Sequence, residues 1–376
     1  MRCGAPSEFC GLVVHRGLPY GLAHLCGELT TLATVDITVM GAGVFGLSIA
    51  FACLRRGAAV QVIDPNGVAA GASGGIVGAL APHVPEQWNP KKEFQRDSLF
   101  MQPAFWASVE DISGEPTGYA KTGRLQPIAD TAALVLAQSR TAGADLHWQG
   151  QAQWQVMPAP DDGWSPPSAT GQVINDTMTA LIHPRTATNA LAAAVVAMGG
   201  TIAPAGVARG QVVWATGWQG LQTLNQNHHR QIGNGVKGQA ALLDYDAAGK
   251  PQIFVDGVHI VPHLNGTVAI GSTSEREFND AHSTDEQLDD VIAKAKQATP
   301  ILADAPVIEK WAGVRPRSRS RAPMLGHHPQ RTGEFIANGG FKIGFGMAPK
   351  IADVMADLML ENVDRIPPPF AADANL

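Results

Sequence analysis

The most informative hydrophobic pattern in the chain lies at Val35–Pro65. A short apolar run containing Ile37 and Val39 predicts a buried strand. The small-residue segment that follows predicts a helix to about Arg56, and a second apolar run, Ala59–Ile63, predicts another strand. Strand, helix and strand in this order are typical of the first unit of a doubly wound α/β domain.

A glycine-rich turn joins the first predicted strand to the helix, in the order Gly41-Ala42-Gly43-Val44-Phe45-Gly46. Gly41 allows a tight turn, Gly43 lets a pyrophosphate approach the backbone, and Gly46 lets helix and strand pack closely. The helix N-terminus offers free N–H groups and a positive dipole to phosphates. Asp64 follows the second strand, where an acid binds ribose hydroxyls and disfavours the 2′-phosphate of NADP. The segment therefore predicts a dinucleotide site.

Three later segments continue the pattern. Gln211–Gly220 is a buried strand that runs into Ala215-Thr216-Gly217, and Ile253–Ser272 has apolar and β-branched runs around an Asn-Gly turn, which predicts a hairpin. Asn338–Leu360 is a glycine-rich turn followed by a helix. Its predicted apolar face consists of Ile351, Val354, Met355 and Leu358.

Composition and charge narrow the function classes. The chain has 376 residues, of which 45% are hydrophobic and 16% charged, so a large core and two domains are expected. The formal net charge of -6 argues against general binding to nucleic acid or to anionic membranes. No apolar run is long enough to span a bilayer.

The four cysteines, Cys3, Cys10, Cys26 and Cys53, form no CxxC pair. We expect free thiols in a reducing compartment, hence a cytoplasmic protein, and no metal site. Residues 1–34 lack the apolar region of a signal peptide. We expect them to form an extension that is poorly ordered or loosely docked, or an artefact of the assigned gene start.

A run of small residues, Gly67–His83, would let backbone lie against a large flat ligand, which favours FAD over NAD. Together with other motifs it resembles the D-amino-acid oxidase superfamily of FAD enzymes, particularly glycine oxidases and sarcosine-oxidase-like proteins. The resemblance runs from about Val35 to Leu360. Its carriers are GAGVFG, GASGGIVGALAPH, VVWATGW, VKGQ, VHIVPHLNGTVAIGST, WAGVRP and GGFKIGFGMAP.

The resemblance implies a two-domain α/β (α+β) fold, with a Rossmann-like FAD domain built from discontinuous segments. That domain would comprise residues 35–85, 181–232 and 318–366. A substrate domain with a mainly antiparallel β-sheet would comprise residues 86–180 and 233–317, followed by a tail at 367–376.

The resemblance also implies a reaction: oxidation of the C–N bond of a small amino acid or amine, with flavin reduction and imine hydrolysis. Oxygen, or another electron acceptor, would reoxidise the flavin, and oxygen would yield hydrogen peroxide. The flavin carries this chemistry, so no protein acid or base is assigned. Whether further copies of the chain associate is left open.

The resemblance places three residues at the substrate. Arg315 of WAGVRP matches the family's carboxylate-binding arginine, for which a planar, always charged fork is suited. Lys342 stands where glycine oxidases often carry a second arginine, and His259 where some carry a tyrosine. The alternatives are an exposed turn lysine and a structural histidine.

The cofactor residues implied by the motifs are backbone-rich positions along these segments. They are Gly41, Gly43, Val44, Phe45, Gly46, Asp64, Pro65, Ala72, Ser73, Gly78, Ala79, Leu80, Val207, Ala215, Thr216, Gly217, Trp218, Gly340, Phe341, Lys342, Ile343 and Gly344. His83 could cap the flavin loop or touch the ring.

Two departures from the family pattern affect the cofactor. The segment Pro204–Gln211 is too short for the usual small β-meander, so Val207 would provide only reduced cover over the adenine. No cysteine lies in the C-terminal half, so FAD is expected to bind noncovalently.

Three other readings stay open. The chain also resembles the flavin domain of a tRNA wobble-uridine modification enzyme, and it could instead be an amine dehydrogenase or a flavin-binding subunit without turnover. The arginines Arg317, Arg319 and Arg321, which alternate after Arg315, would line the entrance or pair with surface acids. They suggest a substrate more acidic than glycine.

Overall fold

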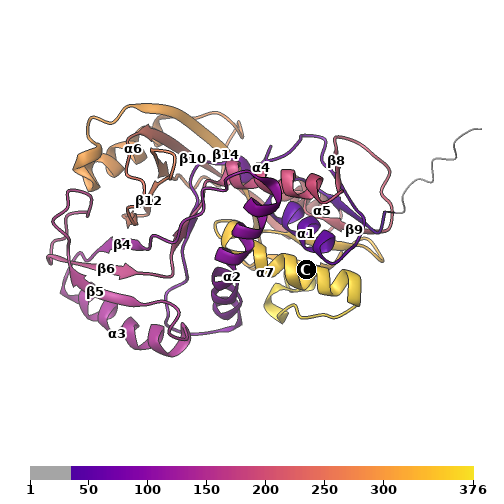
Figure 1. Ribbon diagram of the computed structural model, residues 1–376, viewed down its shortest axis with the longest axis horizontal. Helices are drawn as coiled ribbons and strands as arrows, with labels where there is room; N and C mark the ends of the chain where they lie inside the picture. The colour runs from indigo at the N-terminus through magenta and orange to yellow at the C-terminus, as the bar shows by residue number, and fades with distance from the viewer. Residues whose placement is uncertain (1–34) are drawn as a thin grey trace, which may run out of the picture. The chain divides into compact units, whose positions relative to one another are not determined.

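The computed structural model describes residues 35–376, which lie within one compact unit, Thr34–Leu376 (Figure 1). The expectations about residues 1–34, and about Cys3, Cys10 and Cys26, lie outside the described residues. Cys53 is a free, buried thiol, and burial raises its pKa to about 12. It is therefore an unreactive core residue.

A six-stranded sheet has the strand order β15-β16-β9-β1-β2-β8. All neighbouring pairs are parallel except β15 with β16. The strands are β1 (Ile37–Met40), β2 (Val60–Ile63), β8 (Thr201–Ala203), β9 (Gln211–Trp214), β15 (Met324–His327) and β16 (Phe335–Asn338). The predicted strands at Ile37, Ala59–Ile63 and Gln211 are confirmed, and widely separated segments supply the sheet.

Helices α1 (Val44–Arg55), α2 (Pro90–Ser113), α4 (Pro184–Ala197) and α7 (Gly344–Ala356) pack together, as Figure 1 shows. Their buried side chains form one core cluster with β1, β2 and β9. The predicted apolar face of α7 is confirmed, because Ile351, Val354 and Met355 are at most 1% exposed. Leu358, also buried, lies in the π-helical turn that follows.

An eight-stranded sheet has the order β14-β10-β13-β12-β11-β4-β6-β5, antiparallel except where β11 meets β4. The strands are β4 (Arg124–Pro127), β5 (Trp154–Pro158), β6 (Gln172–Asp176), β10 (Gly233–Asp244), β11 (Gln252–Val255), β12 (Val258–Pro262), β13 (Thr267–Gly271) and β14 (Val307–Ser318). The predicted α/β fold with a mainly antiparallel second sheet is confirmed; the domain boundaries stay a prediction.

Two tight turns connect neighbouring antiparallel strands of this sheet. The predicted Asn-Gly hairpin joins β12 to β13. A second hairpin, between β11 and β12, turns at Asp256 and Gly257, whose φ angles of 47° and 79° are typical of a two-residue type I′ turn. This Asp-Gly signal is present in the sequence, although only the Asn-Gly turn is predicted from it.

The described residues also contain three further α-helices, a small two-stranded sheet and several short 3₁₀ helices. Helix α3 (Thr131–His147) contacts β5, α6 (Glu286–Ala298) contacts β10, β12 and β13, and α5 (Gly217–Gln226) contacts β10 and β14. Strands β3 (Ala79–Leu80) and β7 (Ala180–Leu181) pair with each other. None of the helices in residues 35–376 is long and apolar enough to cross a membrane.

Strand β14 carries the first two of the alternating arginines. It lies at the edge of the sheet, where Pro316 can pair with Gly235 without removing a bond that a further strand needs. The strand ends at Ser318, and Arg321 has a left-handed φ of 61°. The four alternating arginines therefore do not lie on one strand, which agrees with the prediction from the prolines in this segment.

Replacing Gly46 by alanine tests the packing of α1 on β1. A Cβ at Gly46 would lie 2.0 Å from the Gly41 carbonyl oxygen, which is fixed backbone. We expect a loss of roughly 2–3 kcal/mol in unfolding free energy, measured by denaturant titration.

The control is Gly57→Ala at the end of the same helix, where φ is +86° but no atom lies within 4 Å. Conformational strain alone should cost it about 1 kcal/mol. Equal losses for the two variants would contradict the steric account of Gly46.

Candidate active site

A cavity of about 1080 Å³ opens at the carboxyl ends of β1, β2 and β9 and extends to β10 and β14 of the second sheet. The carboxyl edge of a parallel sheet is where doubly wound folds bind ligands. The cavity is lined by backbone and small side chains along much of its length, including Gly41, Gly43, Ala69, Ala70 and Ala72. It therefore offers space for an extended ligand that touches both sheets.

The turn between β1 and α1 forms one end of the cavity. Gly41 has a φ of +115°, and a Cβ there would lie 2.4 Å from the Ala215 carbonyl oxygen, so only glycine suits the position. The Val44 N–H donates to Ser73 Oγ at 2.9 Å. The N-cap residue, Gly43, has no side chain, and Ser73 takes only the Val44 N–H, so the positive end of α1 can still receive an anion.

Asp64 lies at the carboxyl end of β2 and lines the same part of the cavity. Its Oδ2 accepts from the Ala42 N–H at 2.8 Å, and its Oδ1 accepts from the Asn66 N–H at 2.9 Å. Each oxygen retains lone-pair capacity. The carboxylate is thus held rigidly while it can still accept hydrogen bonds from ribose hydroxyls.

The small-residue segment forms one wall of the cavity. A Cβ at Gly78 would lie 1.9 Å from the Ile182 carbonyl oxygen, and one at Gly75 would lie 3.2 Å from the Trp311 ring. The contact at Gly78 requires glycine and the one at Gly75 is tight, and at both positions backbone lines the cavity. An open helix terminus, an anchored acid and a backbone wall are the surfaces that a dinucleotide with a flat ring requires, so the residues present fit FAD.

Arg315 extends from the edge strand β14 into the cavity. Its guanidinium donates to Ser272 Oγ and, at 3.3 Å, to the Thr273 carbonyl oxygen. A Cβ at Gly238 would lie 2.0 Å from Arg315 Nη1, so the guanidinium lies against glycine backbone. Burial lowers the Arg315 pKa to about 10, a value that leaves the group charged at neutral pH.

His259 lies on β12 and also lines the cavity. Its ring lies 4.6 Å from the Phe254 ring, and its buried Nδ1 has no hydrogen-bond partner among the described residues. Burial, with smaller contributions from Arg124, Lys342 and Arg315, lowers its pKa to about 3. The imidazole is therefore neutral near pH 7.

Lys342 belongs to the turn that connects β16 to α7. Its Nζ lies 5.7 Å from the centre of the Phe341 ring. Phe341 has a left-handed φ of 44° and donates its N–H to the Pro316 carbonyl oxygen at 2.8 Å, which fixes the turn beside β14. Partial burial, and then the charge of Arg315, lower the Lys342 pKa. The positive charges of Arg315 and Lys342 are therefore close enough to repel each other.

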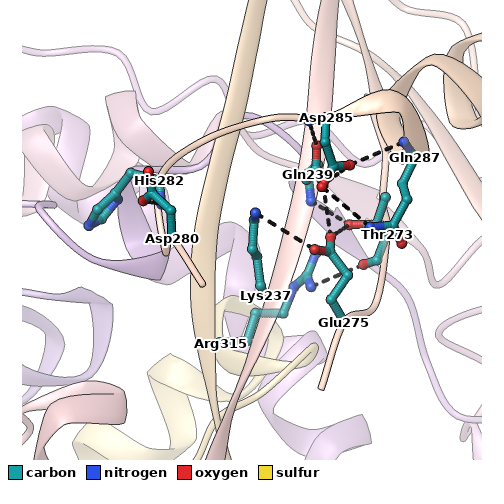
Figure 2. Close-up of polar contacts among 9 residues, drawn as sticks. All are labelled: Lys237, Gln239, Thr273, Glu275, Asp280, His282, Asp285, Gln287 and Arg315. Carbon is teal, nitrogen blue, oxygen red and sulfur yellow. Dashed lines mark hydrogen bonds and ion pairs between the residues drawn. The ribbon is translucent and has the colours of Figure 1, made fainter. Parts of the chain in front are cut away.

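A polar network whose members Lys237, Gln239, Thr273 and Glu275 are buried adjoins Arg315 (Figure 2). Glu275 Oε1 accepts from Gln239 Nε2 at 3.0 Å and from the Thr273 hydroxyl, while its Oε2 lies 3.7 Å from Lys237 Nζ. Gln239 Nε2 also donates to Asp285 Oδ1 at 2.7 Å. Glu275 therefore has Lys237 as its nearest cationic partner, and its charge reaches Arg315 only at longer range.

The structure brings most of the predicted site residues together in this cavity. The lining contains Arg315, Lys342, His259, Gly41, Gly43, Val44, Phe45, Asp64, Pro65, Ala72, Ser73, Gly78, Ala79, Leu80, Ala215, Thr216, Gly217, Trp218, Gly340, Phe341 and Gly344. Their individual roles as ligands stay predictions.

Four predicted positions lie outside the lining. Gly46 and Ile343 serve the packing and capping of helices, and His83 is exposed and hydrogen-bonded to Gln95. Val207 is 75% exposed, because Pro204–Gly210 contains no strand and its backbone bonds to Gln61 and Thr38. Val207 therefore provides no wall of the cavity.

The other arginines separate from Arg315. Arg317 is half-buried, with its guanidinium 5.7 Å from the Phe341 ring, and Arg319 donates to the Leu376 backbone oxygen at 2.7 Å. Within residues 35–376, none of Arg317, Arg319 and Arg321 forms an ion pair. The expected pairing with surface acids is therefore absent from this part of the chain.

Several residues around Arg315 and His259 are not among the sequence predictions; they include Gly238, Phe254, Ser272 and Glu275. Gly238 stands inside the VKGQ motif, so its signal is present in the sequence. Ser272, Phe254 and Glu275 reach Arg315 and His259 only through strand pairing, which no local pattern specifies.

Replacing Gly238 by alanine tests how Arg315 is positioned. The new Cβ would displace the guanidinium, the flexible end of the side chain, rather than fixed backbone. We expect the affinity of the FAD-loaded protein for acetate to fall by about tenfold, the loss of a charge-assisted hydrogen bond, with little change in melting temperature.

Gly249→Ala, in a turn with no atom within 4 Å, is the control and should bind acetate normally. Unchanged acetate affinity in the Gly238 variant would show that the guanidinium does not depend on this contact.

The pH dependence of stability tests the environment of His259. The unfolded imidazole has a pKa near 6.5, whereas the folded pKa is about 3. Between these values the unfolded chain binds more protons, so stability is fully present above about pH 6.5 and falls as the pH drops toward 3. Melting temperatures of His259→Asn should fall less between pH 7 and pH 4.5 than those of the parent protein.

Burial also lowers the pKa of His263, to about 4. His263 is present in both the parent protein and His259→Asn, so the difference between their melting curves is due to His259. Parallel curves for parent and His259→Asn would contradict a buried neutral imidazole.

Comparison with known proteins identifies relatives over most of the chain. The bifunctional protein ThiO/ThiG of Nostoc sp. (strain PCC 7120) is 28% identical over 361 residues, which cover 87% of this chain and 53% of that protein. The chain thus spans about half the length of the first curated relatives it matches. The glycine oxidase of Geobacillus kaustophilus is 23% identical over 86% of this chain and 92% of its own.

Two solved structures share the fold. The Geobacillus kaustophilus glycine oxidase has a TM-score of 0.78 at 20% identity, covering 90% of this chain and 98% of that chain. The iminodiacetate oxidase of Chelativorans sp. BNC1 also has a TM-score of 0.78 at 20% identity, covering 89% and 98%. The FAD dependent oxidoreductase family model matches residues 36–358. The cavity and these similarities agree: the chain belongs to the family of FAD dependent oxidoreductases.

Proposed function

We propose that this protein oxidises the C–N bond of a small amino acid or amine. The observation that carries the proposal is Arg315, a charged and desolvated guanidinium that lies against Gly238 inside the cavity fitted to FAD. A desolvated guanidinium is a strong receptor for a carboxylate, because it offers a planar, bidentate fork that stays charged. The names of the relatives, glycine oxidase and iminodiacetate oxidase, support this substrate class.

The residues of the chain would act by positioning the substrate. Arg315 would hold the carboxylate, and neutral His259, which also lines the cavity, would accept a hydrogen bond from the amine. Two contacts would fix the orientation of the carbon between them, and holding a substrate in the reactive geometry accelerates the reaction. The Trp311 and Phe254 rings, which also line the cavity, would exclude water from this end.

FAD, when bound, supplies the two-electron acceptor for a hydride from the carbon that bears the nitrogen. Loss of that hydride and of one proton from the nitrogen leaves a C=N bond in the product. Water then adds to this bond, giving a carbonyl compound and releasing ammonia or a primary amine. We further propose molecular oxygen as the final electron acceptor, which would yield hydrogen peroxide.

Anaerobic mixing of the FAD-loaded protein with a panel of amines tests the proposal. The panel contains glycine, N-methylglycine, D-amino acids and small secondary amines, and at least one should bleach the flavin absorbance. Arg315→Ala should weaken the binding of the active compound by roughly 10- to 100-fold, the range expected for losing a charged hydrogen-bonded pair. Arg319→Ala, on the exposed turn, is the matched control and should bind normally.

Bleaching by none of these compounds would refute the reaction class. Readmission of oxygen should restore the absorbance and produce one peroxide per substrate. Reoxidation only by an added quinone would instead show a dehydrogenase.

A further inference from the structure

The substrate end of the cavity contains more positive charge than one carboxylate needs. Arg315 and Lys342 both line it, and the nearest lining acid, Asp64, belongs to the opposite end at the β2 terminus. Neither cation forms an ion pair within the described chain, residues 35–376. Both charges are therefore uncompensated by protein carboxylates in direct contact.

The adjoining acidic network does not neutralise them. Glu275 is hydrogen-bonded to Gln239 and Thr273 and has Lys237 as its ion-pair partner (Figure 2). Asp285 is used by Gln239 and by the N-terminus of α6. The network thus contains its own cation, and its side chains leave Arg315 and Lys342 available to a ligand.

His259 lies in the cavity lining with the two cations. The ring is neutral, so it adds a polar contact without adding a third positive charge to this end.

We propose that the substrate is an amino dicarboxylate, with one carboxylate bound by Arg315 and the second by Lys342. This inference rests on the proposed amine oxidation and names its substrate class. Lysine provides a point charge on a flexible stem, whereas arginine provides a fixed fork. Arg315 would therefore hold the carboxylate beside the reacting carbon, and Lys342 would select for the second anionic arm.

The test uses ligands that cannot be oxidised, so that binding is measured apart from turnover. Succinate and succinamate have nearly the same shape, but the second carries an amide in place of one carboxylate. Isothermal titration calorimetry of the FAD-loaded protein should give a dissociation constant for succinate at least about tenfold lower than for succinamate. Lys342→Met should reduce that ratio to below about twofold, while Lys342→Arg keeps it.

Two controls separate charge selection from general damage. Lys294→Met removes the same charge from an exposed position on α6, outside the cavity lining, and should keep the parental ratio. Arg315→Ala should weaken the binding of both succinate and succinamate, because the residue that binds the carboxylate common to both is lost.

Three results would overturn the proposal. These are equal binding of the two ligands by the parent protein, an equal loss of both in Lys342→Met, or a change in that variant confined to the rate of reaction with oxygen. The second result would mean that both cations hold one carboxylate. The third would assign Lys342 to the acceptor step.

Turnover separates this proposal from the function on which it depends. D-aspartate and N-(carboxymethyl)glycine should bleach the flavin at lower concentration than the matching monoamides, D-asparagine and N-(carbamoylmethyl)glycine. Flavin bleaching without a dicarboxylate preference refutes the substrate class alone. A succinate preference without bleaching by any amine refutes the reaction and leaves the two-anion site.

Discussion

The site depends on holding the half-buried Arg315 guanidinium inside the cavity without a carboxylate in direct contact. Desolvating a charge is costly, and the cost must be offset by hydrogen bonds and by the rest of the fold. Here Ser272 and the Thr273 carbonyl accept from the guanidinium, and the Gly238 backbone provides the space beside it. The charge of Glu275 stabilises the cation from a distance while Lys237 occupies the carboxylate. A ligand carboxylate would complete the set.

The two sheets meet close to this arginine. Strand β14 carries Arg315 and pairs with β10, which carries Gly238, along most of their length. The turn after β16 meets the end of β14 through the Phe341 N–H and the Pro316 carbonyl. Strand β16 belongs to the parallel sheet, next to β9. A contact between the sheets thus places Lys342, from the dinucleotide-binding side, beside Arg315.

Much of the fold could be predicted because its signals are local. The turn at Gly41, the hairpin at Asn265-Gly266 and the apolar face of α7 each follow from backbone geometry or periodicity within a few residues. The Arg315 position could be predicted from its motif. The network around Glu275 could not, because β10, β13 and the segment after β13 meet only through long-range pairing.

The short segment before β9 shows where a family comparison reaches its limit. Val207 is predicted to cover the adenine, but residues 204–210 bond along Thr38 and Gln61 and leave Val207 exposed. Loop conformation depends on these particular hydrogen bonds, which the sequence pattern does not reveal.

If Arg315 anchors the substrate carboxylate, the contact can be observed in a crystal structure of the FAD-loaded protein with glycolate, which carries a carboxylate but no amine. We expect electron density for the carboxylate in bidentate contact with the Arg315 guanidinium. Glycolate bound in the cavity away from Arg315, with the guanidinium still on Ser272 and Thr273 alone, would contradict it.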